Sequence, residues 1–185
     1  MALQGAFAEH GQMLDLLGVP HFEIRKKEDL DRHFDALILP GGESTVIGKL
    51  LDESGMTGPV AARIQSGMPV FGTCAGLILL AEEVEGSPVC HGTLGTMSIR
   101  VKRNAYGRQL GSFHVEEEFQ GIGKVPMTFI RAPYIENVYG NAVALARVDG
   151  KIVAARQQNQ LVCAFHPEVT QDVRIHQYFL NMCIA

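Results

Sequence analysis

Three stretches of the 185-residue sequence carry residues whose types and spacing could serve catalysis: a cysteine between two glycines, a His-Pro-Glu sequence and a Gly-Gly pair. In the first, Cys74 lies between a short apolar run at 69–71 and a stretch of helix-forming composition at 75–83. This arrangement predicts a sharp strand-to-helix corner, with Gly72 and Gly76 leaving space on either side as in a nucleophile elbow. A helix N-terminus beside a thiol also favours its thiolate form. We interpret Cys74 as a candidate nucleophile; the alternative is one more buried, small apolar residue.

The candidate base follows a second apolar run at 161–165, which reads as a buried strand. Pro167 biases His166 towards an extended conformation, so His166 and Glu168 point the same way. A carboxylate there can orient the imidazole and stabilise imidazolium while His166 exchanges a proton with Cys74. Alone, His-Pro-Glu is more typical of a strand-end turn. Together with the Cys74 corner it predicts a Cys-His-Glu triad.

The third stretch is an apolar run at 36–39 that breaks into Gly41 and Gly42 before a helix led by Ser44. Glycines allow peptide N–H groups to face a ligand closely, which suits an oxyanion hole shared with the N–H of Ala75. The alternative is an ordinary strand-to-helix turn with Ser44 as its N-cap. Both interpretations can hold at once.

Together these stretches resemble the class I, triad-type glutamine amidotransferases, and among them the glutaminase subunits of pyridoxal 5′-phosphate synthase. The resemblance follows the family's order over nearly the whole chain, at residues 3–6, 39–45, 71–77, 103–109, 129–133 and 165–168. Such a set is far more specific than any one motif. Ile78 stands where many other class I members carry Gln, and this difference favours the pyridoxal-type subfamily.

The resemblance implies hydrolysis of L-glutamine to L-glutamate and ammonia through a thioester on Cys74. It implies that the ammonia passes to a (β/α)₈-barrel synthase subunit for vitamin B6 biosynthesis, and that no cofactor takes part. The residues it nominates for glutamine binding are Gly42, Glu43, Ser44, Arg103, Ile130 and Arg131, with Gln4 as a possible addition near the oxyanion turn. Arginine suits the substrate carboxylate because its fork makes paired hydrogen bonds, although each arginine could equally form an exposed ion pair.

The alternation of apolar runs and helical stretches up to residue 85 predicts an α/β fold. We expect a flavodoxin-like three-layer sandwich with a mostly parallel central sheet, a strand at 22–25, and added short β-strands after residue 95. Asp149-Gly150 predicts a hairpin between 142–148 and 151–156, and 172–183 predicts a closing helix. We expect one domain over 1–185. Its first strand is expected to be truncated, because relatives carry several strand residues where only Met1 and Ala2 precede Leu3.

The overall composition of the sequence limits which kinds of partner and which cellular compartment are expected. A net charge of −4 gives no reason to expect nucleic acid or an anionic membrane as partner. No run approaches the ~20 apolar residues of a transmembrane helix, and the start lacks a signal-peptide pattern. Four cysteines without close pairing are typical of a reduced, cytoplasmic protein, and Cys90, Cys163 and Cys183 are expected to be structural. No spacing typical of metal ligands is present.

Three other functions stay open at this level. One is a class I glutaminase that feeds another synthase. Another is a cysteine hydrolase or peptidase on the same scaffold, because a corner cysteine with a histidine is not unique to amide transfer. The last is a non-catalytic binding subunit.

Overall fold

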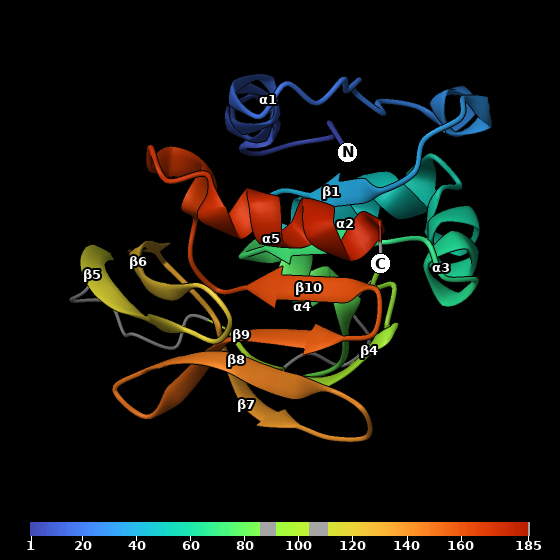
Figure 1. Ribbon diagram of the computed structural model, residues 1–185. Helices are drawn as coiled ribbons and strands as arrows, with labels where there is room; N and C mark the ends of the chain where they lie inside the picture. Colours follow the sequence, from blue (N-terminus) through green and yellow to red (C-terminus); the bar gives the residue numbers. More distant parts are fainter. Residues whose placement is uncertain (86–91, 104–110, 185) are drawn as a thin grey trace.

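The computed structural model describes residues 1–85, 92–103 and 111–184, and in this part of the chain ten strands form one sheet (Figure 1). The strands are β1 (Leu37–Leu39), β2 (Val70–Thr73), β3 (Ala81–Glu85), β4 (Met97–Lys102), β5 (Ser112–Phe119), β6 (Gly123–Ile130), β7 (Tyr134–Val138), β8 (Val143–Val148), β9 (Lys151–Gln157) and β10 (Gln160–Cys163). The helices are α1 (Phe7–Leu16), α2 (Ser44–Glu53), α3 (Thr57–Gln65), α4 (Ala75–Leu80) and α5 (Arg174–Cys183), with 3₁₀ helices η1 (Lys27–Asp31) and η2 (Pro167–Val169).

The strands that lead to the predicted site lie side by side and run parallel. β2 pairs with β1 on one side and with β10 on the other, with Thr73 opposite Cys163. Beyond β10 the sheet continues through β9, β7, β4 and β3, and the hairpin of β5 and β6 is joined to it through β8. The two chain segments that carry the predicted triad therefore leave the sheet at the same edge.

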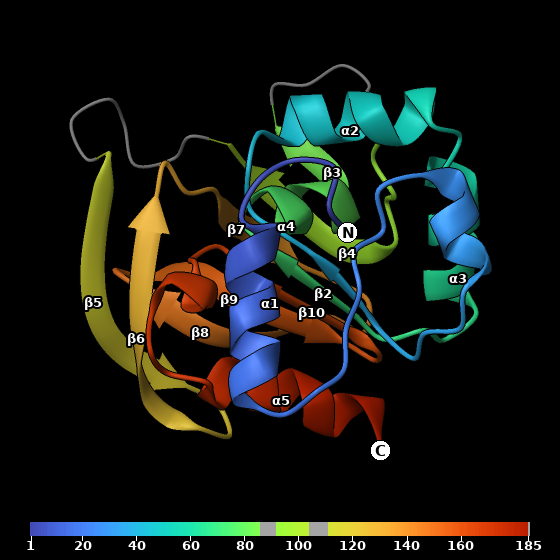
Figure 2. The ribbon, with the colours of Figure 1, turned by 90° about the horizontal axis from the view of Figure 1, so that it is seen from above.

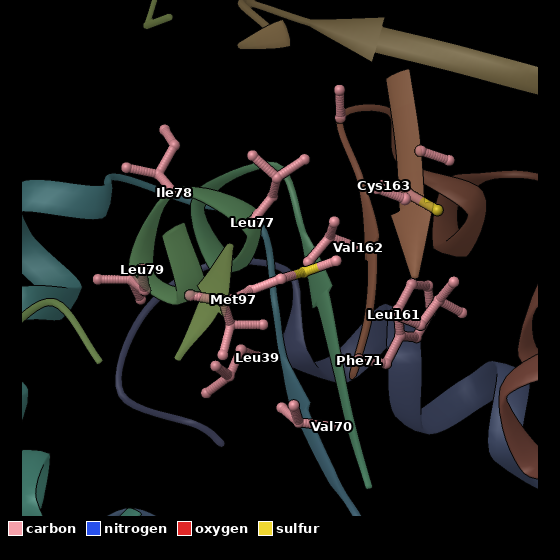
Figure 3. Packing of buried hydrophobic residues seen from close by; sticks show 14 of the residues in the cluster. Leu39, Val70, Phe71, Leu77, Ile78, Leu79, Met97, Leu161, Val162 and Cys163 are labelled. Atoms are coloured by element: carbon pink, nitrogen blue, oxygen red, sulfur yellow. The ribbon is translucent and has the colours of Figure 1, made fainter. Parts of the chain in front are cut away.

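The layers are seen from above in Figure 2, where β2 and β10 lie between α2 and α4 on one side and α1 and α5 on the other. On the α5 side, the rings of Phe71 and Phe179 lie 5.4 Å apart. On the other side all six residues of α4 are buried. Figure 3 shows Leu77, Ile78 and Leu79 in the apolar cluster that fills the space beside these strands.

Glycine sets how closely α4 approaches the sheet. A Cβ on Gly76 would lie 2.1 Å from the carbonyl oxygen of Leu39, closer than any real contact. α4 can therefore rest directly against β1, and this contact places Cys74 near the end of β1 as well as β2.

Two expectations about elements, and one alternative interpretation, are wrong. The helix predicted over 75–83 ends at Leu80, because Ala81–Glu85 form strand β3 beside β4; this pairing overrides the helical preference of alanine and glutamate. The strand predicted at 22–25 forms no β-ladder in the described structure. Ile24 instead accepts one backbone hydrogen bond, 2.8 Å long, from Ala2. Ser44 is the first residue of α2 and not its N-cap, which is Glu43.

Other elements agree with the sequence. The hairpin of β8 and β9 turns at Asp149 and Gly150, and both have positive φ, as a type I′ turn requires. Short strands follow residue 95 as expected, beginning with β4, and α5 begins two residues after the expected start of the closing helix and ends at the expected residue. No helix in the described ranges is long and apolar enough to cross a membrane.

Candidate active site

Cys74 occupies the single residue between the end of β2 and the start of α4. Its φ of 47° and ψ of −93° lie in a strained region for a non-glycine residue, at a cost of about 1–3 kcal/mol. Its N–H donates a 2.8 Å hydrogen bond to the carbonyl of Cys163 at the end of β10. The neighbouring strand thus holds Cys74 in the strained conformation that a nucleophile elbow needs.

His166 and Glu168 stand beside Cys74 because β10 runs parallel to β2. The His166 N–H donates to the carbonyl of Thr128 on β6 at 2.8 Å, which fixes the backbone after β10. Its ring nitrogen Nδ1 lies 2.8 Å from Oε1 of Glu168. Both side chains are almost fully buried, so water competes little for this hydrogen bond.

The surroundings of His166 favour its protonated form. Burial by itself lowers the pKa of His166, but hydrogen bonds with Cys74 and Glu168, and the charge of Glu168, outweigh burial and raise the pKa to about 10. An imidazole held between a thiol and a carboxylate can stabilise a thiolate and later give a proton to a leaving group.

Gly41 comes so close to the triad that no side chain fits there. A Cβ on Gly41 would lie 2.3 Å from Cε1 of His166 and 3.4 Å from Cβ of Cys74. The Gly41 carbonyl accepts a 3.0 Å hydrogen bond from the N–H of Ala6, just before α1. The turn after β1 therefore lies against the triad, where an oxyanion site would need it.

Gln4 reaches the same turn. Its side-chain oxygen accepts a 2.9 Å hydrogen bond from the N–H of Glu43, and it would clash with any Cβ on Gly42. Gln4 thus supports the turn through this hydrogen bond. Ala75, the other residue predicted to bind the oxyanion, is buried at the start of α4. Oxyanion binding by Gly41, Gly42 and Ala75 stays a prediction.

The nominated glutamine-binding residues come together only in part. Arg103 Nη2 donates a 3.0 Å hydrogen bond to Oγ of Ser44, which joins the end of β4 to the start of α2. Ile130 ends β6, and Arg131 follows it with an exposed side chain and a φ of 45°. Residues 104–109 of the same nominated segment lie outside the described residues.

The other cysteines contrast with Cys74. Cys163 is completely buried, and its burial raises the pKa of its thiol well above the usual value, which keeps it protonated. Cys183 is half-buried, and its pKa is also raised by burial. Cys90 lies outside the described residues. In the described ranges, no group of histidine, cysteine and acidic side chains is placed to hold a metal ion.

Sequence reasoning missed three polar residues behind Glu168. His10 on α1, Thr73 on β2 and His176 on α5 are buried and hydrogen-bonded to one another through His10. One feature of the sequence indicates that His10 is buried. It lies three residues before the apolar Met13, and residues at this spacing share one face of a helix.

With the geometry established, comparisons with known proteins identify the family. A family model described as the SNO glutamine amidotransferase family matches residues 1–185. The chain belongs to this family. Among curated proteins, the pyridoxal 5′-phosphate synthase subunit PdxT of Streptococcus pneumoniae is 56% identical over 186 residues, which cover 99% of this chain and 95% of the relative.

Solved structures agree with this assignment. A crystal structure of a glutamine amidotransferase superposes with a TM-score of 0.95 at 45% identity, covering 100% of this chain and 97% of that one. A putative GMP synthase protein from Thermoplasma acidophilum has a TM-score of 0.66 at 21% identity, covering 98% of this chain and 90% of that one, and shows likeness of fold alone. The expected fold class and family resemblance are confirmed.

Proposed function

We propose that the protein is the glutaminase subunit of a pyridoxal 5′-phosphate synthase and hydrolyses L-glutamine through Cys74. The observation that carries this proposal is His166, held at 2.8 Å from Glu168 and kept protonated beside Cys74, in a member of the glutamine amidotransferase family. That arrangement supplies a nucleophile, a proton carrier and a group that orients the carrier.

The proposed reaction has two covalent steps. The Cys74 thiolate attacks the side-chain amide carbon of glutamine, and the tetrahedral intermediate expels ammonia as its C–N bond breaks, with a proton supplied by His166. Water then attacks the thioester carbon and gives a proton to His166. The C–S bond breaks, L-glutamate leaves, and the thiolate–imidazolium pair is restored. Glu168 keeps the Nδ1 proton of His166 in place throughout.

The residues around the triad are assigned to oxyanion binding and glutamine binding by where they lie in the structure. N–H groups of the Gly41–Gly42 turn and of Ala75 stabilise the oxyanion that forms on the amide oxygen. Arg103, together with Arg131, pairs with the α-carboxylate of glutamine, and the link from Arg103 to Ser44 holds its guanidinium at the start of α2. Glu43 is exposed at this end of α2 and is open to the α-ammonium group.

The ammonia passes to a partner synthase subunit, proposed to be a (β/α)₈ barrel. The relative's name, a pyridoxal 5′-phosphate synthase subunit, supports this at 56% identity. The proposed compartment is the cytoplasm, in keeping with free Cys74, Cys163 and Cys183.

The partner is tested with glutamine labelled with ¹⁵N in its side-chain amide. The purified chain is incubated with the barrel subunit of a pyridoxal 5′-phosphate synthase, together with the sugar phosphate substrates of that barrel, and the product is analysed by mass spectrometry. The proposal predicts ¹⁵N in the pyridine ring of pyridoxal 5′-phosphate. Glutamate release without label in the ring, where free ¹⁵N-ammonia does label it, would contradict the partner but not the glutaminase.

A further inference from the structure

We propose that His10 is a positioning residue for the triad: as a neutral imidazole it holds the second carboxylate oxygen of Glu168, so that the first stays on His166. This inference rests on the proposed function. It adds α1, β2 and α5 to the set of elements that determine the geometry of the triad.

One oxygen of the Glu168 carboxylate is buried without a hydrogen-bond partner among the described residues. Oε1 of Glu168 bonds His166, whereas Oε2 has no hydrogen-bond partner among the described residues, although the side chain is fully buried. Leaving a buried carboxylate oxygen unpaired costs free energy. The polar group that faces Oε2 is Nε2 of His10, at 3.6 Å. A shift of a few tenths of an ångström would make this a hydrogen bond.

His10 is itself held from both ends. Its Nδ1 lies 2.9 Å from Nε2 of His176 on α5, and its Nε2 lies 3.0 Å from Oγ1 of Thr73. Thr73 immediately precedes Cys74, so the contact also joins His10 to the nucleophile's strand. Such a clamp fixes the ring of His10 against η2, which carries Glu168.

The hydrogen-bond pattern assigns one tautomer. A proton on Nε2 of His10 points towards Thr73 and the carboxylate of Glu168, and its Nδ1 then accepts from Nε2–H of His176. This leaves Nδ1 of His176, which has no partner among the described residues, as an unpaired acceptor and not as a costlier unpaired donor. Glu168 then receives one N–H from each side, from His166 and from His10.

Burial keeps this chain of imidazoles neutral. Desolvation lowers the pKa of His10 well below its usual value, and the nearby His176 and His166 lower it further. Desolvation lowers the pKa of His176 to about 4. The titratable groups that face His10 are thus His176 from α5, His166 and Glu168 around η2, and the chain's amino group. A neutral donor stabilises the Glu168 carboxylate without competing with His166 for the proton.

The test compares two amides at position 10. In His10→Gln the longer side chain places an N–H where Nε2 of His10 lies. In His10→Asn the amide reaches His176 but falls short of Glu168. Met13→Ala serves as the control, because it removes a buried contact from the same helix without touching the polar chain.

Two measurements are made on each variant, with the partner synthase subunit present where glutamine is turned over. The first is kcat and KM for glutamate release. The second is the pH dependence of alkylation of Cys74 by iodoacetamide, which needs no glutaminase activity and follows the thiolate–imidazolium pair.

The inference predicts that His10→Asn lowers kcat by roughly tenfold with KM unchanged and moves the onset of Cys74 alkylation to higher pH, because a loosened Glu168 stabilises imidazolium less. His10→Gln and Met13→Ala should stay near wild type in both measurements. Equal effects of the two amides, or no effect of either, would overturn it. If the wild type alkylates normally yet does not hydrolyse glutamine, the proposed function fails, and the alkylation profiles still decide the role of His10.

Discussion

At the residue scale, the hydrogen bond between His166 and Glu168 helps to set the pH up to which His166 stays protonated. Glu168→Gln removes the negative charge that helps to raise the pKa of His166, so this pKa should fall from about 10. We expect kcat for glutamate release to drop and the alkaline limb of its pH profile to move to lower pH, since in the proposed reaction His166 must be protonated to release ammonia. An alkaline limb unchanged in Glu168→Gln would contradict the assigned role.

Gly41 offers a second test at the residue scale. Gly41→Ala would place a Cβ 2.3 Å from the His166 ring, and the ring must move. Displacement by about 1 Å should cost roughly 100-fold in kcat/KM for glutamine. Gly58→Ala on α3 is the matched control, because its Cβ meets no atom within 4 Å. Equal activities of the two variants would show that Gly41 does not determine the triad's geometry.

At the scale of elements, α1 and α5 are joined by a hydrogen bond between His10 and His176. Both imidazoles are neutral in the folded protein because burial lowers their pKa values. The pKa of His176 is about 4 in the folded protein and about 6.5 in the unfolded chain, so below pH 6.5 the unfolded chain binds more protons. The free energy of unfolding should therefore fall as the pH drops from about 6.5 to 4, by up to about 1.4 kcal/mol per pH unit for this one group.

Urea unfolding at several pH values measures this effect. His176→Gln, which cannot titrate, should show a shallower fall in the free energy of unfolding than the wild type. A wild-type slope in His176→Gln would mean that other groups cause the acid sensitivity.

Elements also show what the sequence can predict. The strand-to-helix corner at Cys74 and the Asp149-Gly150 hairpin follow from local rules, since a glycine pattern or a turn dipeptide determines them. The end of α4 does not, because Ala81–Glu85 have helical composition and become a strand only by pairing with β4. The sequence allows a triad to be proposed because Cys74, His166 and Glu168 follow recognisable strands. The grouping of His10, Thr73 and His176 could not be predicted, because their meeting depends on how three distant elements pack.

At the scale of the whole molecule, one sheet and one cluster of buried side chains support the prediction of a single domain over 1–185. Tryptophan is absent from the sequence, so tyrosine fluorescence and far-ultraviolet circular dichroism are the probes to compare during urea unfolding. We expect both to follow one cooperative transition with the same midpoint. Separate midpoints would indicate that the β5–β6 hairpin region unfolds apart from the strands that carry the triad.

The central claim is that Cys74 attacks glutamine, and the most direct test pairs two cysteine variants. Cys74→Ala and Cys163→Ala each remove one buried thiol at the end of neighbouring strands, but only the first touches His166. Glutamate release from L-glutamine, measured with the partner synthase subunit, should vanish in Cys74→Ala and persist in Cys163→Ala. Turnover retained by a folded Cys74→Ala variant would contradict the account.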